Sequence, residues 1–170
     1  MIDKKLQDAI NNQINKEFAA SYTYLAMAAH LDSMFLKGFA SWMEKQSDEE
    51  RGHGQKLLRY MLDRGGNVQL AAIPKPEAKL GSVKHVIELS LAQERENTAA
   101  IYDIYELARE LKDYASQQQM EWFIQEQVEE EKTVSDILGR LEFAGDDKSA
   151  LLILDDQMGQ RPKESAPELE

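Results

Sequence analysis

The chain has 170 residues, no cysteine, and 31 Asp and Glu against 20 Lys and Arg, which gives a formal net charge of −11. This length suits one domain with a substantial core, the absence of cysteine excludes disulfides, and the acidic excess argues against nucleic acid as a partner because phosphate binding needs clustered Lys and Arg. Since the start, MIDKKLQDAINNQ, lacks the apolar stretch of a signal peptide and no run approaches the roughly 20 apolar residues of a membrane span, we expect a cytoplasmic protein with no membrane partner.

Apolar residues recur at helical spacing in four long segments of the chain. They predict four helices, at about 4–33, 36–64, 83–111 and 115–143. Only a few residues separate the first segment from the second, and the third from the fourth. Because short links join antiparallel neighbours, each of these pairs should form an antiparallel hairpin.

The linker GGNVQLAAIPKPEAKLGS, residues 65–82, joins the second segment to the third. Its glycines suit a helix C-terminus, its prolines stiffen an extended stretch, and Ser82 suits an N-cap. A helix of about 29 residues is about 43 Å long, whereas eighteen extended residues reach about 60 Å. The linker can therefore run the length of the bundle, which predicts an all-α four-helix bundle with one long crossover.

The C-terminal region divides into two parts after the expected bundle of residues 1–145. The stretch KSALLILDDQM, residues 148–158, predicts a short fifth helix that has no place inside a four-helix core. It either packs on the outside of its own subunit or buries its apolar residues, Leu151, Leu152, Ile153 and Leu154, against other subunits. We assign 146–158 to a subunit interface, and we expect the polar, proline-containing tail 159–170 to be disordered.

Each of the four predicted helices has an apolar seam that turns polar near its middle. In an antiparallel arrangement the middles meet at one level, which would bring together four carboxylates, those of Glu17, Glu50, Glu94 and Glu130, with His53 and Gln127 beside them. Unpaired ionised carboxylates in a bundle interior destabilise the fold by several kcal/mol each. No Lys or Arg occupies the seams at this level. The pattern favours a pair of divalent cations over polar groups that share protons and water.

The spacing of the ligand candidates narrows the choice of metal. Glu50-x-x-His53 places a carboxylate and an imidazole on one helix face, so both side chains can reach one ion. Di-iron bundles commonly use a Glu from each of two helices and Glu-x-x-His from each of the other two. Here the fourth helix departs from that pattern and offers Gln127-x-x-Glu130. Carboxylates with one imidazole favour iron or manganese over a thiolate-type zinc site.

These residues and their surroundings resemble the prokaryotic non-haem ferritins over about residues 1–158. The motifs are NKEFAASYTYL (15–25), SDEERGH (47–53), LAQERENT (91–98) and EWFIQEQVEEEK (121–132). The resemblance implies a ferroxidase centre in which Glu50 bridges two irons. One iron would be held by Glu17, Glu50 and His53, and the other by Glu50, Glu94 and Glu130, with Gln127 close to the second.

The resemblance also implies a function and partners. Fe²⁺ would be oxidised by O₂ or peroxide, and the ferric iron would be stored as a mineral inside a shell of 24 identical subunits. Tyr24 and Trp122 match aromatic residues that the family keeps beside the centre. Either could supply an electron, but a core tyrosine with a satisfied hydroxyl explains the position of Tyr24 equally well.

A second group of carboxylates, Glu49, Glu126 and Glu129, flanks the seam on two helices. Spacing alone leaves open whether they form a solvated acidic face or a metal site. The resemblance implies a third iron site at these positions, with Glu130 shared between it and the centre.

Related families and other functions predict different features. Bacterioferritins carry Glu-x-x-His on both relevant helices and a haem-ligating Met immediately after the first of those Glu residues. In this chain that Glu is Glu50, Arg51 follows it, and the second pair ends in Glu130, so we expect no haem. DNA-protecting mini-ferritins build their iron site between subunits, and a rubrerythrin would add a Cys-ligated iron module. Two alternatives remain: a small di-iron oxidase or peroxidase that detoxifies iron or oxidant without storage, and a non-enzymatic, metal-binding helical assembly protein.

Overall fold

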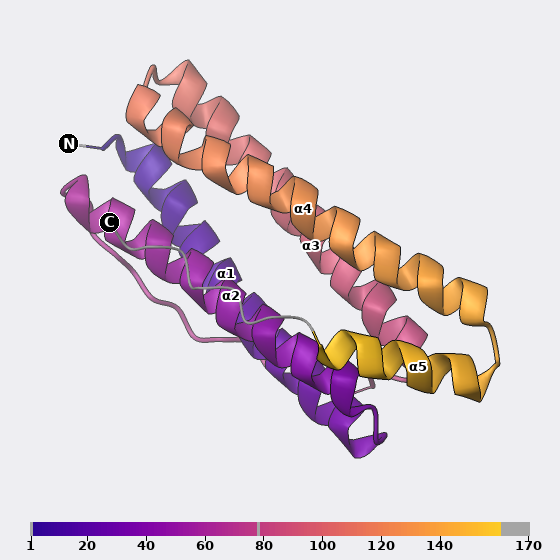
Figure 1. Ribbon diagram of the computed structural model, residues 1–170. Helices are drawn as coiled ribbons and strands as arrows, with labels where there is room; N and C mark the ends of the chain where they lie inside the picture. Colours follow the sequence, from indigo (N-terminus) through magenta and orange to yellow (C-terminus); the bar gives the residue numbers. More distant parts are fainter. Residues whose placement is uncertain (1, 78, 161–170) are drawn as a thin grey trace.

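The computed structural model describes residues 2–77 and 79–160, which form five α-helices and no strand (Figure 1). The helices are α1 (Lys4–Ser33), α2 (Lys37–Asp63), α3 (Val83–Glu110), α4 (Tyr114–Ala144) and α5 (Lys148–Gly159). The prediction of an all-α, four-helix bundle with a short fifth helix is confirmed. None of these helices is long and apolar enough to cross a membrane.

Side-chain caps begin four of the five helices. Backbone N–H groups of the first turn donate to the side chains of Asp3, Ser82, Asp113 and Asp147. Such caps satisfy donors that a helix leaves unpaired at its N-terminus. Three-residue turns, 34–36 and 111–113, join α1 to α2 and α3 to α4. The two hairpins are therefore antiparallel, as the short links predicted.

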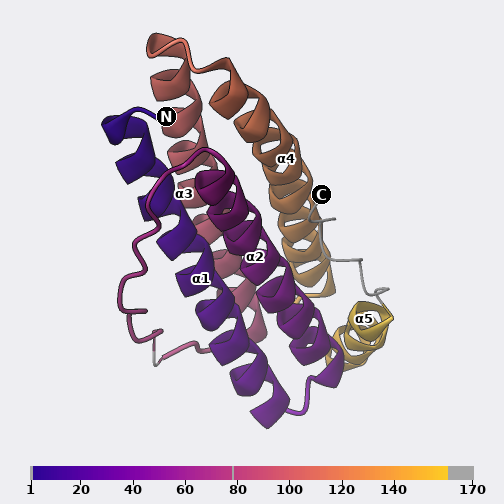
Figure 2. The ribbon, with the colours of Figure 1, turned by 90° about the vertical axis from the view of Figure 1, so that its left-hand side faces the viewer.

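The linker between α2 and α3 lies along α1 as an extended chain (Figure 2). Side chains four residues apart on α1, those of Gln7, Asn11 and Asn15, bind the linker backbone at alternate positions 67, 69 and 71, with distances of 2.8–2.9 Å. The spacing matches because four helical residues rise about 6.0 Å and two extended residues about 6.6 Å. The linker thus runs the length of the bundle, and α2 and α3 point in the same direction.

The core of the bundle is divided into two apolar clusters by a polar layer. One cluster includes Tyr24, Phe39, Met43 and Val134, and the other includes Ile14, Leu57, Ile101 and Phe123. Along every helix of the bundle, the residues between the two clusters include buried polar side chains. This layer is the interruption of the apolar seams that the sequence predicted.

Helix α5 lies across the end of the bundle where α4 ends and α2 begins (Figure 1). The buried Asp155 accepts a hydrogen bond from the backbone N–H of Phe39 at 2.8 Å, so it caps α2, which has no side-chain cap of its own. A Cβ atom at Gly38 would lie 1.6 Å from the carbonyl oxygen of Asp155. Glycine at position 38 therefore allows α5 to approach this closely.

One face of α5 packs on its own subunit, and the other is exposed. Leu154 and Met158 are buried in the first apolar cluster and Leu151 packs against it, whereas Leu152 and Ile153 are 57% and 60% exposed. Leu154 therefore follows the first of the two packings that the sequence left open, because its side chain completes the core of its own bundle. The assignment of 146–158 to a subunit interface stays a prediction. The helix continues to Gly159, and residues 161–170 of the expected tail lie outside the described residues.

Candidate metal centre

The polar layer holds one carboxylate from each helix of the bundle. Glu17, Glu50, Glu94 and Glu130 are all buried, with 0–8% exposure, and His53 and Gln127 are buried among them. Within residues 2–77 and 79–160, no Lys or Arg side chain is buried. The layer therefore gathers negative charge without the buried cation that would offset its loss of hydration.

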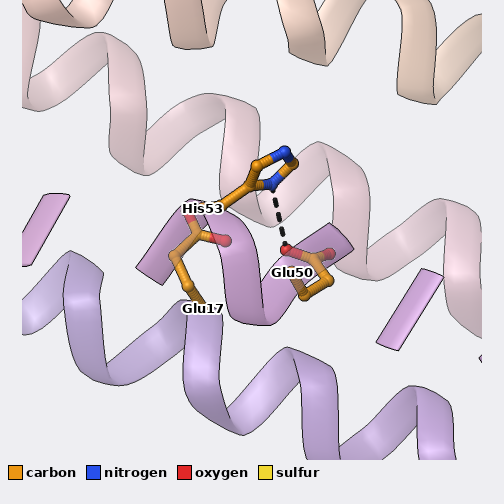
Figure 3. Close-up of side chains that lie close together, drawn as sticks. All are labelled: Glu17, Glu50 and His53. Atoms are coloured by element: carbon orange, nitrogen blue, oxygen red, sulfur yellow. Dashed lines mark ion pairs between the residues drawn. The ribbon is translucent and has the colours of Figure 1, made fainter. Parts of the chain in front are cut away.

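Glu17 from α1 and the Glu50/His53 pair from α2 point toward one another (Figure 3). Each offers a ligand atom, and the three atoms lie within 4.8 Å of one another. Ligands at about 2.0–2.2 Å from a shared ion lie at most about 4.4 Å apart. A small movement of these side chains would therefore let all three hold one cation.

His53 is suited to bind that cation because its burial favours the neutral form of the ring. Burial lowers the pKa of His53, the neighbouring ammonium of Lys56 lowers it further, and the charge of Glu17 opposes both effects. Nδ1 of His53 lies 3.5 Å from Oε2 of Glu50, and neither atom has a hydrogen-bond partner among the described residues. With the imidazole proton on Nε2, Nδ1 carries a lone pair, as a carboxylate oxygen does, so a cation between the two atoms would satisfy both.

Two carboxylates of the layer, those of Glu50 and Glu94, have raised pKa values and therefore hold protons more tightly than carboxylates in water. Burial raises the pKa of Glu50 well above its usual value, and the charges of Glu94, Glu17 and Glu130 add to this effect. Burial also raises the pKa of Glu94, against the hydrogen bonds that it accepts. A divalent cation would replace these protons, so its binding should strengthen as the pH rises.

The carboxylates from α3 and α4 accept hydrogen bonds from neighbouring side chains. Glu94 accepts from the Tyr24 hydroxyl and from Nε2 of Gln127, the latter at 3.3 Å, and Glu130 accepts from Nε2 of Gln46 at 2.9 Å. Burial raises the pKa of Tyr24 well above its usual value, so its hydroxyl keeps the proton that it donates. These bonds fix the orientation of both carboxylates.

Trp122 lies beside the imidazole of the layer. Its ring meets His53 edge-on, with 5.5 Å between the ring centroids, and the Lys56 ammonium lies 4.3 Å from the centre of the Trp122 ring. These contacts restrict the orientation of the His53 ring.

The outer carboxylates of the predicted third site are not part of this close group. Glu49 and Glu126 are half-buried, and Glu129 is exposed. In the part of the chain that the structure describes, Glu17, Glu50 and His53 are the one group of three whose ligand atoms come within 4.8 Å. The structure therefore brings Glu49, Glu126 and Glu129 into no group of that closeness.

Three amide side chains of the layer had no role assigned from the sequence. Gln13 and Gln46 lie on the predicted seams, and their contacts with Glu17 and Glu130 emerge only from the packing. Asn97 was missed because a seam that is followed in alternating steps of three and four residues passes from Leu91 and Glu94 to Thr98 and Ile101, and so leaves Asn97 out. A usable signal was present, since Asn97 follows Glu94 at the same spacing of three residues as His53 follows Glu50.

Known proteins that are similar to this chain agree with one another in family. A family model described as a ferritin-like domain matches residues 7–144. The bacterial non-heme ferritin of Staphylococcus aureus (strain USA300) is 39% identical over 161 residues, which cover 95% of this chain and 97% of that protein. The bacterial non-heme ferritin of Staphylococcus saprophyticus is also 39% identical over 161 residues, with 95% and 96% coverage.

Solved structures give the same result. An open pore ferritin from the hyperthermophilic archaeon Archaeoglobus fulgidus superposes with a TM-score of 0.94 at 38% identity, over 95% of this chain and 99% of that chain. A humanized archaeal ferritin superposes with a TM-score of 0.95 at 38% identity, over 97% and 100% of the two chains.

Proposed function

The chain belongs to the ferritin family, and we propose that it is an iron-storage protein that oxidises Fe²⁺ in the polar layer of each bundle and keeps the Fe³⁺ as a mineral inside a shell of 24 copies. The observation that carries this proposal is the buried group of Glu17, Glu50 and His53, whose ligand atoms lie within 4.8 Å of one another with no buried Lys or Arg in the described part of the chain. Iron is the substrate and cargo of this site, and we propose no haem.

Two Fe²⁺ ions would occupy the layer. Glu17, Glu50 and His53 would hold the first ion, and Glu50, Glu94 and Glu130 the second, so that Glu50 is shared. The closeness of Glu50 to Glu94, Glu17 and Glu130, seen in their combined effect on its pKa, supports this sharing. Two divalent ions would neutralise the four carboxylates of the layer.

The reaction that we propose is a two-electron transfer from the ion pair to an oxidant. Each Fe²⁺ loses one electron, and O₂ takes up both electrons and two protons to leave as H₂O₂. With peroxide as the oxidant, the O–O bond breaks and two electrons and two protons give two waters. The protein's part is to hold both ions next to one oxidant molecule in a site that excludes bulk water.

Two further features belong to this proposal. Glu49, Glu126 and Glu129, with Glu130 shared, would form a weaker third iron site that governs the movement of ions out of the centre. Tyr24 would act at the centre through its hydrogen bond to Glu94, and its position beside that carboxylate also suits an electron donor.

Assembly into a cytoplasmic shell is part of the proposed storage function. The exposed Leu152 and Ile153 of α5 give each subunit an apolar face that another copy would cover. A shell is also what separates storage from the alternative of a small di-iron oxidase or peroxidase, because a mineral needs an enclosed volume.

Aerobic addition of Fe²⁺ to the metal-free protein tests the proposal. We expect an amber solution in which hundreds of irons co-migrate with the protein, and light scattering from a closed assembly rather than from a monomer or dimer. Rust that precipitates away from the protein would contradict storage. Rapid oxidation by a native monomer or dimer would instead identify the small oxidase.

A further inference from the structure

We propose that Gln13, Asn97 and Gln127 form a relay of oriented amides that makes Gln127 a hydrogen-bond donor to Glu94 instead of a metal ligand. The inference rests on the proposed function for the assignment of Glu94 to the second ion. It replaces the ligand role expected for Gln127 with a positioning role, and it adds two residues to the site.

The relay begins at Gln13 on α1, which is 1% exposed. Its Nε2 donates to Oε1 of Glu17 at 2.7 Å and to Oδ1 of Asn97. An amide nitrogen has two hydrogens, and both are used here. Because Gln13 presents a donor to Asn97, the amide of Asn97 must face Gln13 with its oxygen.

The amide of Asn97 on α3 lies between those of Gln13 and Gln127, so its orientation sets that of Gln127. Because its oxygen faces Gln13, its Nδ2 faces Oε2 of Glu17 at 3.5 Å and Oε1 of Gln127 at 3.4 Å. Exchange of oxygen and nitrogen in Asn97 would place two NH₂ groups against each other at Gln13 and two oxygens against each other at Gln127. Only one orientation satisfies both neighbours.

Gln127 on α4 ends the relay, with its oxygen toward Asn97. The two hydrogens of its Nε2 are shared among three acceptors, the backbone carbonyl of Glu94 at 3.1 Å, Oε2 of Glu94 at 3.3 Å and Oγ1 of Thr98 at 3.3 Å. A backbone carbonyl can only accept, so this contact fixes the same orientation independently. An amide NH₂ has no lone pair for a cation, so Gln127 offers Glu94 a donor and leaves the second ion a set of carboxylates alone.

The surroundings of Asn97 make the relay testable by substitution. Asn97 lines a groove of about 170 Å³ between α1 and α3, together with Ala19, Ala20 and Thr23. The open side leaves room for leucine, which has nearly the shape of asparagine but no polar atoms. Thr23→Val is a matched control, because Thr23 lines the same groove and its hydroxyl bonds only to Ala19 of its own helix among the contacts of the described residues.

Binding of Co²⁺ to the metal-free protein, followed by calorimetry and by visible absorption, provides the test without any oxidation. We expect wild type to bind two tight Co²⁺ ions per subunit. Asn97→Leu should weaken the second ion about tenfold while the first changes by less than about threefold, since Glu17 keeps its bond from Gln13. Thr23→Val should match wild type.

Two results are specific to a relay. The variant Asn97→Leu/Gln127→Leu should bind the second ion no more weakly than Gln127→Leu alone, because both changes break one path. Gln127→Leu saturated with Co²⁺ should keep the wild-type visible spectrum, because no ligand atom is lost. The relay would be overturned if each substitution weakened binding of the second ion by its own factor and these factors multiplied in the double variant. It would also be overturned if the visible bands of Co²⁺-saturated Gln127→Leu differed in intensity from those of wild type.

Two further outcomes separate the relay from the proposed function. Wild-type protein that binds fewer than two Co²⁺ per subunit would overturn the proposed function and the relay with it. Two bound ions with an unaltered second affinity in Asn97→Leu would overturn the relay alone. If Asn97→Leu does not fold, as judged by circular dichroism, Gln13→Leu serves instead. It should weaken the second ion although Gln13 contacts none of its ligands, and an unaltered second affinity there would also overturn the relay.

Discussion

The two halves of the polar layer carry the same number of carboxylates but differ in what surrounds them. In the half formed by α1 and α2, Oε2 of Glu50 and Nδ1 of His53 have no hydrogen-bond partner among the described residues. In the half formed by α3 and α4, Glu94 and Glu130 accept hydrogen bonds from Tyr24, Gln127 and Gln46. The first half has two atoms without a hydrogen-bond partner beside a Glu17 carboxylate that Gln13 holds, whereas both carboxylates of the second half are held by hydrogen bonds.

This difference indicates separate tasks for the two halves. The first half gains most from a cation, because the cation satisfies two atoms that have no hydrogen-bond partner among the described residues, and one of these atoms is a nitrogen donor. The second half offers an ion carboxylates without a nitrogen donor, so it should bind iron more weakly and release it more readily. Glu50 lies between the halves, and variants on either side can test the division.

The largest effect should come from Glu50→Ala, which removes the carboxylate common to both ions. Rapid Fe²⁺ oxidation, measured by stopped-flow absorption, should fall by more than about 100-fold, since even partners of metal ligands contribute 10–100-fold. The fold should survive because one carboxylate fewer relieves repulsion in the layer. Glu44→Ala, at an exposed position of the same helix, is the control. An oxidation rate near that of wild type in Glu50→Ala would refute the di-iron assignment.

The pH dependence of stability should show the protons that the empty layer holds. The pKa of Glu50 is raised in the folded protein, chiefly by burial, above an unfolded value of about 4.3. The folded state therefore binds more protons, and the metal-free protein should lose stability as the pH rises above that value. The lowered pKa of His53 acts in the opposite direction below about pH 6.5, but it cancels between two proteins that both keep His53.

The measurement compares melting temperatures of wild type and Glu50→Gln in the presence of a chelator. The melting temperature of the variant should increase relative to that of wild type as the pH rises. The difference should grow by about 2–4 °C for each kcal/mol by which the two free energies of unfolding diverge. A constant difference from pH 5 to pH 8 would show that Glu50 keeps an ordinary pKa in the folded protein.

A smaller effect is expected for Tyr24→Phe, which removes a donor to Glu94 from the second half only. Loss of one such hydrogen bond corresponds to about 1 kcal/mol, so the second metal ion should bind about three- to tenfold more weakly while the first is unchanged. Calorimetry with Zn²⁺ would measure both affinities. Tyr60→Phe removes a hydroxyl bonded to Ser116, away from the layer, and serves as the control. Equal weakening of both ions would remove the distinction between the halves.

The smallest effect on the first reaction should follow from the replacement of Glu49, Glu126 and Glu129 by Gln. Oxidation of the first two irons per subunit should stay within about twofold of wild type, since these side chains lie outside the group of Glu17, Glu50 and His53. Later turnovers or the oxygen consumed per iron should change. A charge-matched variant with exposed Glu44, Glu110 and Glu121 replaced by Gln tests for a general effect of charge. If both variants mineralise like the parent, the third site is absent.

The sequence predicted the helices and the level of the polar layer because both follow from local periodicity. A seam that turns polar at the same height in four helices can be recognised before any contact is known, and the two apolar clusters on either side confirm it. The Glu50/His53 pair was recognisable for the same reason, since three residues on a helix return to one face.

The contacts that hold the ligands could not be predicted in the same way. Whether Gln46 donates to Glu130 depends on how α2 and α4 are rotated about their axes, and periodicity does not specify this. The docking of α5 depends on Asp155 meeting a helix start 116 residues earlier in the chain. An apolar stretch shows that a face will be buried, but it does not show against which surface.

The ladder between α1 and the linker has a consequence for the topology of the whole bundle. Two helical hairpins can be placed side by side in two arrangements that are nearly mirror images, and helices with similar apolar stripes pack about equally well in both. The arrangements differ in the surface that the crossover must follow. Gln7, Asn11 and Asn15 bind the linker backbone only when it passes over α1, so three polar side chains on an outer face favour one arrangement over its near-degenerate competitor.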